Sequence, residues 1–421
     1  MLKVLFRHSF WNAVATFSYQ GSTFVSNFLV IKLLDHTEYG KLSLVNFTAF
    51  YAANLLQFGV GSTVSRFVAR NLEDRTRMPA ILWLCGIFSL LSSLVGLFVI
   101  ASTAGFVANH IFTEPSMAWP LAIASLSVPG LVGAIYFNGL LQGLHGFRAL
   151  ALSSAISGIL FMGIVVAGAW TGTLTGAVMG FVCGAVVRSA IMGGAALFLL
   201  RYQWRSSRQD VICEWKRGEI RGFQVPAGLA GFLTLPTLWL MPTILAHEMQ
   251  NFADVGSYSV ILMLKTMVVL PAWVVALALQ PSLERAWASN QPQTATRIFR
   301  TALAAGATTV IALATIVVIF AADLMTVFGK GYAAESAELQ LMMIAAIPEA
   351  FALTCYMRIQ MAGRMWSVIF AALLPRDAVM LIVVVVMAPQ YGLRGAIVAH
   401  AVGAIVNLVG AYWLSVRSVR G

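Results

Sequence analysis

The sequence predicts an all-α polytopic membrane protein with twelve transmembrane helices, arranged as two six-helix bundles related by a pseudo-two-fold axis along the membrane normal. The first observation is composition: 59% of the 421 residues are hydrophobic and 10% are charged, whereas soluble domains carry about 25% charged residues. The mean hydropathy is +0.84. The second observation is a series of apolar segments of membrane-spanning length, and the third is a match between the two halves of the chain.

Each apolar segment is long enough to cross a bilayer, which takes about 20 helical residues. The first follows a short basic start, MLKVLFRHSFW, and continues to Leu34. This run is too long for a signal-peptide core and lacks a small-residue cleavage site, so we expect a retained helix. The twelve segments lie near residues 10–34, 41–65, 80–104, 119–142, 149–170, 174–200, 223–246, 255–281, 301–322, 339–360, 366–388 and 395–415.

Positive charge alternates between the loops on the two sides of these segments. One set of loops and termini is basic, and it comprises Lys3, Arg7, Arg66, Arg70, Arg75, Arg77, Arg148, Arg201, Arg205, Arg208, Lys216, Arg217, Arg221, Arg285, Arg297, Arg300, Arg364, Arg417 and Arg420. The opposite set has only Lys41, Lys330 and Arg394. Basic loops stay on the cytoplasmic side, so both termini are expected there. The net charge of +11 has the same origin and does not indicate nucleic-acid binding.

The two halves of the chain repeat one another. Pro129 and Pro348 lie 219 residues apart, and at the same offset Gly176-Ala177-Val178 matches Gly395-Ala396-Ile397. Six spans in each half mean that both halves enter the membrane from the same side, as in the parallel type of transporter repeat. The predicted organisation is therefore a bundle at 1–200, a basic cytoplasmic linker at 201–222, and a second bundle at 223–421.

Five ionisable side chains lie at a similar depth inside the predicted spans. They are Arg188, Lys265, Glu349, Arg376 and Asp377. A charge at that depth costs roughly 2.5–3.5 kcal/mol even on lenient insertion scales, and such groups face a bundle interior or a wet cavity. They could form interhelical ion pairs that fix the fold. They could instead line a hydrated chamber whose three cations and two carboxylates leave a surplus positive charge, which suits an anion.

Narrower expectations follow from the positions of these residues. Arg376 and Asp377 are adjacent, so they point about 100° apart on a helix and are not expected to face each other. A proline directly precedes both Glu349 and Arg376, and a helix break beside a charge is typical of a transporter site. A packing kink is the alternative. His400 in the last span is open to two interpretations, a packed polar contact or a proton site.

The segment LLDHTEYGKLSLVNF (Leu33–Phe47), followed by QFGVGSTVSRFVARN (Gln57–Asn71), resembles the opening hairpin of the polysaccharide flippases, the Wzx or O-antigen transporter family of the MOP superfamily. In that family a short EYG loop joins the first two helices, and the second helix ends in a glycine-containing turn and a basic stretch. The resemblance implies a V-shaped carrier in the bacterial inner membrane. Such a carrier moves an undecaprenyl-diphosphate-linked oligosaccharide by alternating access.

Together with this resemblance, the intramembrane charges give a hypothesis for the site. Arg188, Lys265 and Arg376 are expected to bind the diphosphate, because the guanidinium presents a planar fork of donors to phosphate. Glu349 and Asp377 are expected to couple transport to an ion. The expected partners are the lipid-linked oligosaccharide, membrane lipids and other proteins of polysaccharide assembly. No cofactor, metal or catalytic residue is expected.

Two other functions remain as alternatives. A cation-coupled multidrug exporter of the related MATE type is disfavoured because the first span has no acidic residue before Asp35 and a net cationic chamber repels cationic drugs. A membrane glycosyltransferase or polysaccharide polymerase needs catalytic residues displayed in a sizeable loop, and the predicted outside loops are short. The four cysteines have no CxxC spacing, so neither a disulfide framework nor a zinc site is expected.

Overall fold

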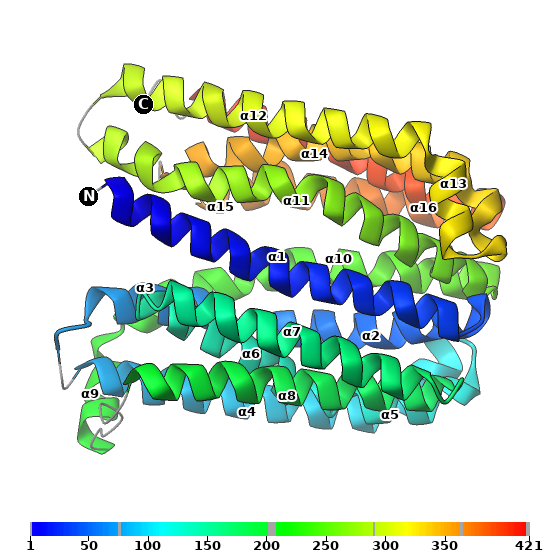
Figure 1. The fold of residues 1–421 in the computed structure, drawn as a ribbon, viewed down its shortest axis with the longest axis horizontal. Coiled ribbons are helices and arrows are strands. Elements are labelled where there is room, and N and C mark those ends of the chain that lie inside the picture. The colour runs from blue at the N-terminus through cyan, green and yellow to red at the C-terminus, as the bar shows by residue number, and fades with distance from the viewer. Residues whose placement is uncertain (1, 75–76, 201–207, 289–290, 362–364, 418–421) are drawn as a thin grey trace. The chain divides into compact units, whose positions relative to one another are not determined.

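The computed structural model describes residues 2–74, 77–200, 208–288, 291–361 and 365–417, and throughout these residues the regular structure is helical (Figure 1). All twelve predicted segments fall on helices. Helices suit a chain in lipid because each satisfies its own backbone hydrogen bonds where water is absent. Contacts divide the chain into two compact units, Met1–Trp239 and Leu240–Gly421.

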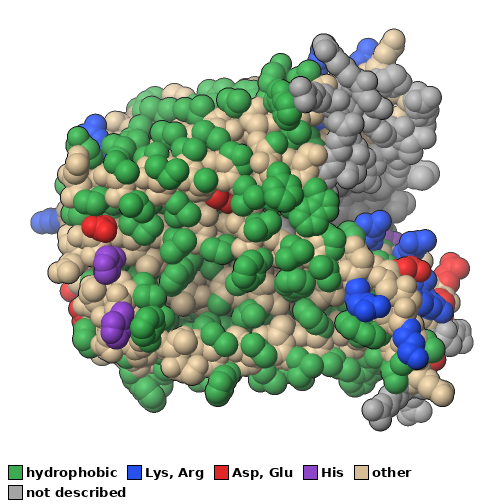
Figure 2. Space-filling view, turned by 180° about the vertical axis from the view of Figure 1, so that it is seen from behind, with side chains coloured by type: hydrophobic (Ala, Val, Ile, Leu, Met, Phe, Trp, Pro, Cys, Tyr) green, Lys and Arg blue, Asp and Glu red, His purple; other side chains and the backbone are tan. Residues whose placement is uncertain are grey.

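Nine helices of the described residues are long and apolar enough to cross a membrane. The last of the nine contains both of the final predicted spans. The first two predicted spans are not among the nine. These two spans have a lower hydropathy because they contain the amides Asn12, Gln20, Asn46 and Asn54. On the face in Figure 2, hydrophobic side chains cover the broad middle, and most Lys and Arg side chains in view gather toward one end. The predicted all-α polytopic membrane protein is confirmed, and the count of twelve spans stays a prediction.

Unit 1 is built around the packing of α7 against α1 and α8, with α6 on α8 and α3 on α6. Close approach of α7 and α8 needs small residues, since a Cβ on Gly180 would lie 2.9 Å from the carbonyl oxygen of Ile164. The elements of the unit are α1 (Leu2–Leu33), α2 (His36–Leu56), α3 (Val60–Arg70), α4 (Arg77–Phe106), η1 (Val107–Ile111), η2 (Pro115–Met117), α5 (Ala118–Ala124), α6 (Ser127–Gly143), α7 (Phe147–Ala169), α8 (Leu174–Leu200), α9 (Arg208–Arg217) and the first part of α10 (Glu219–Met249).

The second predicted span, 41–65, is two helices rather than one. α2 ends at Leu56 and α3 begins at Val60, and between them Phe58 and Gly59 have positive φ angles of 45° and 74°. A Cβ on Gly59 would lie 2.7 Å from the Cβ of Ala227, so glycine is required both by the backbone and by the close approach of α10. The EYG residues also differ from the loop that the resemblance suggested, because they lie in the first turns of α2.

The predicted linker at 201–222 contains a helix, α9, that packs on the start of α4. Arg77 donates from Nε and Nη2 to the two carboxylate oxygens of Glu214, at 3.0 and 3.1 Å, and from Nη2 to Glu219 at 2.8 Å. The Glu214 side chain is only 2% exposed. A bidentate, buried pair of this kind has a fixed geometry. The described part of the linker is therefore anchored to the first bundle.

Unit 2 packs α11 on α12, α12 on α14, and α14 on α16. α16 is two helical arms joined at Gly392, where φ is +52°. Its second arm lies close to the chain before the first, since a Cβ on Gly410 would meet the Ala371 carbonyl oxygen at 2.2 Å. The elements are the rest of α10, α11 (Phe252–Ala288), α12 (Pro292–Ile319), α13 (Ala321–Phe328), η3 (Lys330–Glu335), α14 (Ser336–Met361), α15 (Met365–Val368), η4 (Ile369–Leu373) and α16 (Leu374–Arg417).

The border between the two compact units lies inside α10, after Trp239. The predicted bundles at 1–200 and 223–421 were drawn from an internal sequence repeat, which packing within each unit does not test. The predicted repeat relation and its axis therefore stay predictions.

Candidate functional site

Two of the five predicted charges form an ion pair inside unit 2. The Nζ of Lys265, on α11, lies 2.8 Å from Oε2 of Glu349 on α14. The Lys265 side chain is 9% exposed and that of Glu349 34%. Pro348 directly precedes Glu349, yet α14 continues through it as one helix, so the expected break does not occur here. The pair places a balanced charge between two helices.

Arg376 and Asp377 form a second ion pair, so the expectation that these neighbours do not face each other is wrong. Arg376 Nε donates to Asp377 Oδ1 at 2.7 Å, and Nη2 lies at the same distance. The two Cα–Cβ bonds diverge, but the long arginine side chain folds back over the gap. The π-helical turn η4 ends immediately before Leu374 and Pro375. Such a turn accommodates a proline, which has no N–H to donate, and often occurs at functional sites.

Asp377 retains one unused acceptor. Its side chain is 4% exposed, and Oδ2 is buried without a hydrogen-bond partner among the described residues. A buried unpaired polar atom costs about 1–3 kcal/mol, and more when it is charged. A proton on Oδ2, or a donor from a ligand, would remove that cost. This carboxylate is therefore the group in unit 2 whose surroundings favour a change of protonation or of partner.

Two neutral polar pairs lie beside the ion pairs. The Tyr258 hydroxyl and His400 Nε2 are hydrogen bonded at 2.6 Å, and the Tyr356 hydroxyl donates to the Asn407 side chain. His400 lies within electrostatic range of Lys265 and Arg376, and Tyr356 within range of both carboxylates. We call the whole set the polar cluster of unit 2: Tyr258, Lys265, Glu349, Tyr356, Arg376, Asp377, His400 and Asn407.

The charges of the polar cluster balance, with two cations against two carboxylates. The surplus positive charge expected from the sequence came from counting Arg188, which lies in unit 1, so the polar cluster itself has no surplus. His400 fits the first of its two interpretations, a packed polar contact, through its bond to Tyr258. An anion would gain no net charge attraction from these two balanced pairs until one carboxylate was protonated.

Arg188 lies in unit 1, on α8, and is held very differently. Its side chain is enclosed between the rings of Tyr19 on α1 and Phe161 on α7, with the guanidinium carbon 4.2 and 4.1 Å from the ring centroids. Nη2 donates to the Ser22 hydroxyl at 3.1 Å. The residue is 3% exposed, Nε has no partner, and no described carboxylate pairs with it. Within the described part of the chain, Arg188 is thus a buried cation without a counter-ion.

The structure brings Lys265, Glu349, Arg376 and Asp377 together within one unit and places Arg188 in the other. Convergence of all three cations on one anion stays a prediction. Among the described residues, no group of three or more His, Cys, Asp or Glu side chains could hold a metal ion.

Sequence reasoning missed the neutral members of the polar cluster, although a spacing signal was present. Tyr258 precedes Lys265 by seven residues, Glu349 precedes Tyr356 by seven, and His400 precedes Asn407 by seven. Seven residues are close to two helical turns, so each pair shares one face of its helix. Three such polar stripes on three apolar helices predict a shared polar interior. The rings around Arg188 had no comparable signal.

Comparison with known families gives one match. The sequence profile described as "Polysaccharide biosynthesis protein" matches residues 5–287, which is well over half of the chain. No curated protein matches the sequence.

Several solved structures share the fold. An inward-facing multidrug resistance MATE family transporter of the MOP superfamily is 14% identical, with a TM-score of 0.78, and the match covers 96% of this chain and 98% of that one. A MOP superfamily transporter from Pyrococcus furiosus, whose binding pocket is described as having reverse polarity, is 16% identical with a TM-score of 0.72, over 100% and 96%. An outward-facing MATE structure matches with a TM-score of 0.72 and 15% identity, over 99% and 95%.

Proposed function

Because the chain belongs to the polysaccharide biosynthesis protein family, we propose that it translocates an undecaprenyl-diphosphate-linked oligosaccharide across the bacterial inner membrane for surface polysaccharide biosynthesis. The family supports the pathway class, and the fold shared with MOP transporters supports movement of a substrate by alternating access rather than bond chemistry. In this proposal both termini lie in the cytoplasm, and the lipid-linked sugar is the partner of the site.

The observation that carries the proposal is the unpaired guanidinium of Arg188. A buried charge is normally paired, and the cost of leaving it unpaired is several kcal/mol. Here the two rings and one hydroxyl offset part of that cost, while Nε stays without a partner. A diphosphate would supply both the missing charge and the missing acceptor. Because Tyr19 and Phe161 enclose the guanidinium in this state, binding requires α1 or α7 to move.

The polar cluster of unit 2 supplies the switchable part of the mechanism. Arg376 is neutralised by Asp377, and Lys265 by Glu349. Protonation of Asp377 at the unpartnered Oδ2 would release the charge of Arg376 for the anion, and deprotonation would reclaim it. Anion affinity in unit 2 then follows the protonation state of a carboxylate, which is how a proton gradient could drive the cycle.

A proteoliposome assay tests the proposal. The purified chain is reconstituted with an undecaprenyl-diphosphate-linked oligosaccharide, and arrival of the sugar in the outer leaflet is measured with a membrane-impermeant glycosidase. We expect transport by the natural chain that responds to an imposed proton gradient, and none above the protein-free rate for Arg188→Ala. Export of a cationic dye without movement of the lipid-linked sugar would instead favour the MATE-type exporter.

A further inference from the structure

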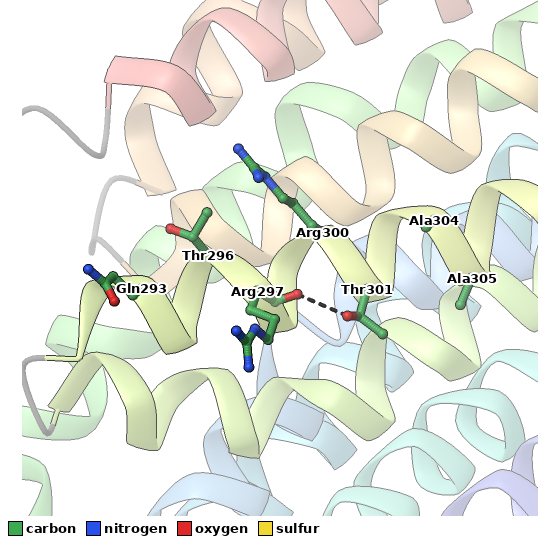
Figure 3. A pocket seen from close by; sticks show the side chains of 7 residues that line it. All are labelled: Gln293, Thr296, Arg297, Arg300, Thr301, Ala304 and Ala305. Carbon is green, nitrogen blue, oxygen red and sulfur yellow. Dashed lines mark hydrogen bonds between the residues drawn. The ribbon is translucent and has the colours of Figure 1, made fainter.

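A groove runs along one face of about the first four turns of α12, at the basic end of this helix (Figure 3). Its volume is about 780 Å³. The lining residues recur at intervals of three and four, so they lie along one face of α12. They are Gln293, Thr296, Arg297, Arg300, Thr301, Ala304 and Ala305. In Figure 3 the side chains of Arg297 and Arg300 extend to opposite sides of the helix, so a cation is available on each flank of the groove.

The arginines of the groove have no counter-ion among the residues that the structure describes. Arg297 and Arg300 are exposed, and neither forms an ion pair with a described residue. A third guanidinium approaches from α14, because Arg358 lies over the ring of Phe299 at 4.9 Å and is close enough to Arg300 for the two charges to repel. Three positive charges are thus gathered at adjoining helix ends without a described carboxylate. An anion placed in the groove would relieve this repulsion.

The groove is polar at one end and apolar at the other, as a ligand with a charged headgroup and an acyl chain requires. Its first turns offer the hydroxyls of Thr296 and Thr301 beside the guanidinium groups, and the Thr301 hydroxyl donates to the Arg297 carbonyl at 3.0 Å, which leaves its lone pairs free to accept. Further along the same helix the lining changes to Ala304 and Ala305, and exposed isoleucines follow, 42% exposed at position 311 and 52% at position 316. A charged headgroup and an acyl chain would each meet matching surface.

We propose that this groove binds an anionic phospholipid, with the headgroup phosphate between Arg297 and Arg300 and an acyl chain along the alanine and isoleucine surface. Arginines at the end of a span follow the positive-inside rule and need no ligand. The groove, the hydroxyls and the third guanidinium behind Arg300 are what distinguish this end of α12. The occupant is a bulk phospholipid rather than the lipid-linked sugar because acidic phospholipid is abundant in the leaflet and occupies a site of this chemistry by mass action.

The test is native mass spectrometry of the full chain titrated with phosphatidylglycerol, with phosphatidylcholine as the neutral lipid. Each surface arginine contributes about 1 kcal/mol to attraction of an acidic lipid, so Arg297→Gln/Arg300→Gln is expected to weaken phosphatidylglycerol binding roughly 30-fold. The matched control, Arg148→Gln/Arg394→Gln, removes the same charge from exposed positions outside the groove and is expected to leave the affinity unchanged. Phosphatidylcholine binding should not change in either variant.

A second substitution keeps both arginines in place. Ala304→Glu puts a carboxylate four residues after Arg300, where it pairs with the guanidinium and repels phosphate, so it is expected to reproduce the loss of phosphatidylglycerol binding. If the control variant loses affinity as much as the groove variant, or if Ala304→Glu binds as the natural chain does, the site does not exist. If undecaprenyl diphosphate displaces phosphatidylglycerol at equal concentration and the groove variant abolishes that displacement, the groove belongs to the transport substrate and the phospholipid assignment is wrong. If inorganic phosphate alone displaces the lipid, the groove is only a general anion site, and the proposal is again overturned.

Discussion

Replacement of Arg188 by methionine should lower transport strongly while leaving the fold nearly as stable as before. Two ring contacts near 4 Å contribute up to about 2 kcal/mol each where water is excluded. The hydrogen bond to Ser22 contributes about 1.5–3 kcal/mol, as bonds to charged groups do. The gross stabilisation is therefore roughly 5–7 kcal/mol.

The opposing costs are of the same size. Burial of the guanidinium costs several kcal/mol, of which roughly 2.5–3.5 kcal/mol appears even on insertion scales. The buried Nε without a partner costs about 1–3 kcal/mol more. Methionine removes both costs and keeps contact with the rings of Tyr19 and Phe161 through its thioether. We expect the free energy of unfolding to change by less than about 2 kcal/mol.

Function should respond much more strongly than stability. Loss of a charge-assisted contact of about 1.5–3 kcal/mol to the diphosphate corresponds to roughly a 10- to 150-fold decrease in transport. Arg188→Lys keeps the charge and loses the planar fork, so it should retain partial activity. Glycosidase-accessible sugar in proteoliposomes gives the transport rate, and urea titration of the same preparations gives stability.

The reasoning is refuted by either of two outcomes. In the first, Arg188→Met transports at the natural rate, so that no anion depends on this guanidinium. In the second, Arg188→Met loses several kcal/mol of stability and its transport falls only in proportion to the folded fraction. Arg188 would then be a structural residue held by its rings.

Three further predictions concern other residues. Arg77→Met should destabilise the chain by about 2–3 kcal/mol, which is less than for a buried charge left with no partner, because Arg217 remains beside Glu214. Urea titration measures the free energy of unfolding. The control is Arg148→Met, which is expected to stay within about 0.5 kcal/mol of the natural chain. Asp377→Asn should leave transport active but weaken its dependence on the proton gradient, and unchanged dependence would make the carboxylate structural. Cys213, in α9, should escape a membrane-impermeant thiol reagent in intact cells if the basic loops are cytoplasmic.

Hydropathy and charge located nearly every helix, because burial in lipid requires long apolar segments whatever the neighbours. The same reasoning could not locate the break at Phe58 and Gly59, since a positive φ angle at phenylalanine depends on the approach of α10 rather than on local sequence. The family resemblance suggests a loop at the EYG residues, whereas the structure places them in α2. Asp35 caps α2 by accepting a hydrogen bond from the backbone N–H of Glu38. This cap stabilises the start of the helix at the EYG residues.

Four of the five intramembrane charges lie in the polar cluster of unit 2, as two ion pairs, and Arg188 lies in unit 1. The pairing within unit 2 does not follow from the sequence. The argument for Arg376 and Asp377 used only the angle between neighbouring side chains on a helix and neglected the reach of the arginine. The pair Lys265 and Glu349 was open to prediction only as one of several combinations, because sequence distance carries no information about contacts between helices. The stripes at seven-residue spacing show that more of the polar cluster could have been predicted from the sequence.

The predicted internal repeat relates the two kinds of charged environment. The offset of 219 residues that aligns Gly184 with Gly403 also aligns Arg188 with Asn407. Both lie on the last helix of their half, and both contact a tyrosine: Arg188 the ring of Tyr19, Asn407 the hydroxyl of Tyr356. At this position one unit holds a permanent cation and the other a neutral amide, with its cations instead beside carboxylates.

We infer that the two units hold an anion by different means. In unit 1 the charge of Arg188 is fixed, because arginine keeps its proton at any physiological pH. In the proposed mechanism, the charge that unit 2 offers to a ligand depends on protonation of Asp377, which pairs with Arg376 and has an unpartnered Oδ2. An anion held at two variable sites would be lost whenever both were neutral, and one held at two fixed sites would not be released. One fixed and one variable site allow the substrate to be retained during the conformational change and released after it.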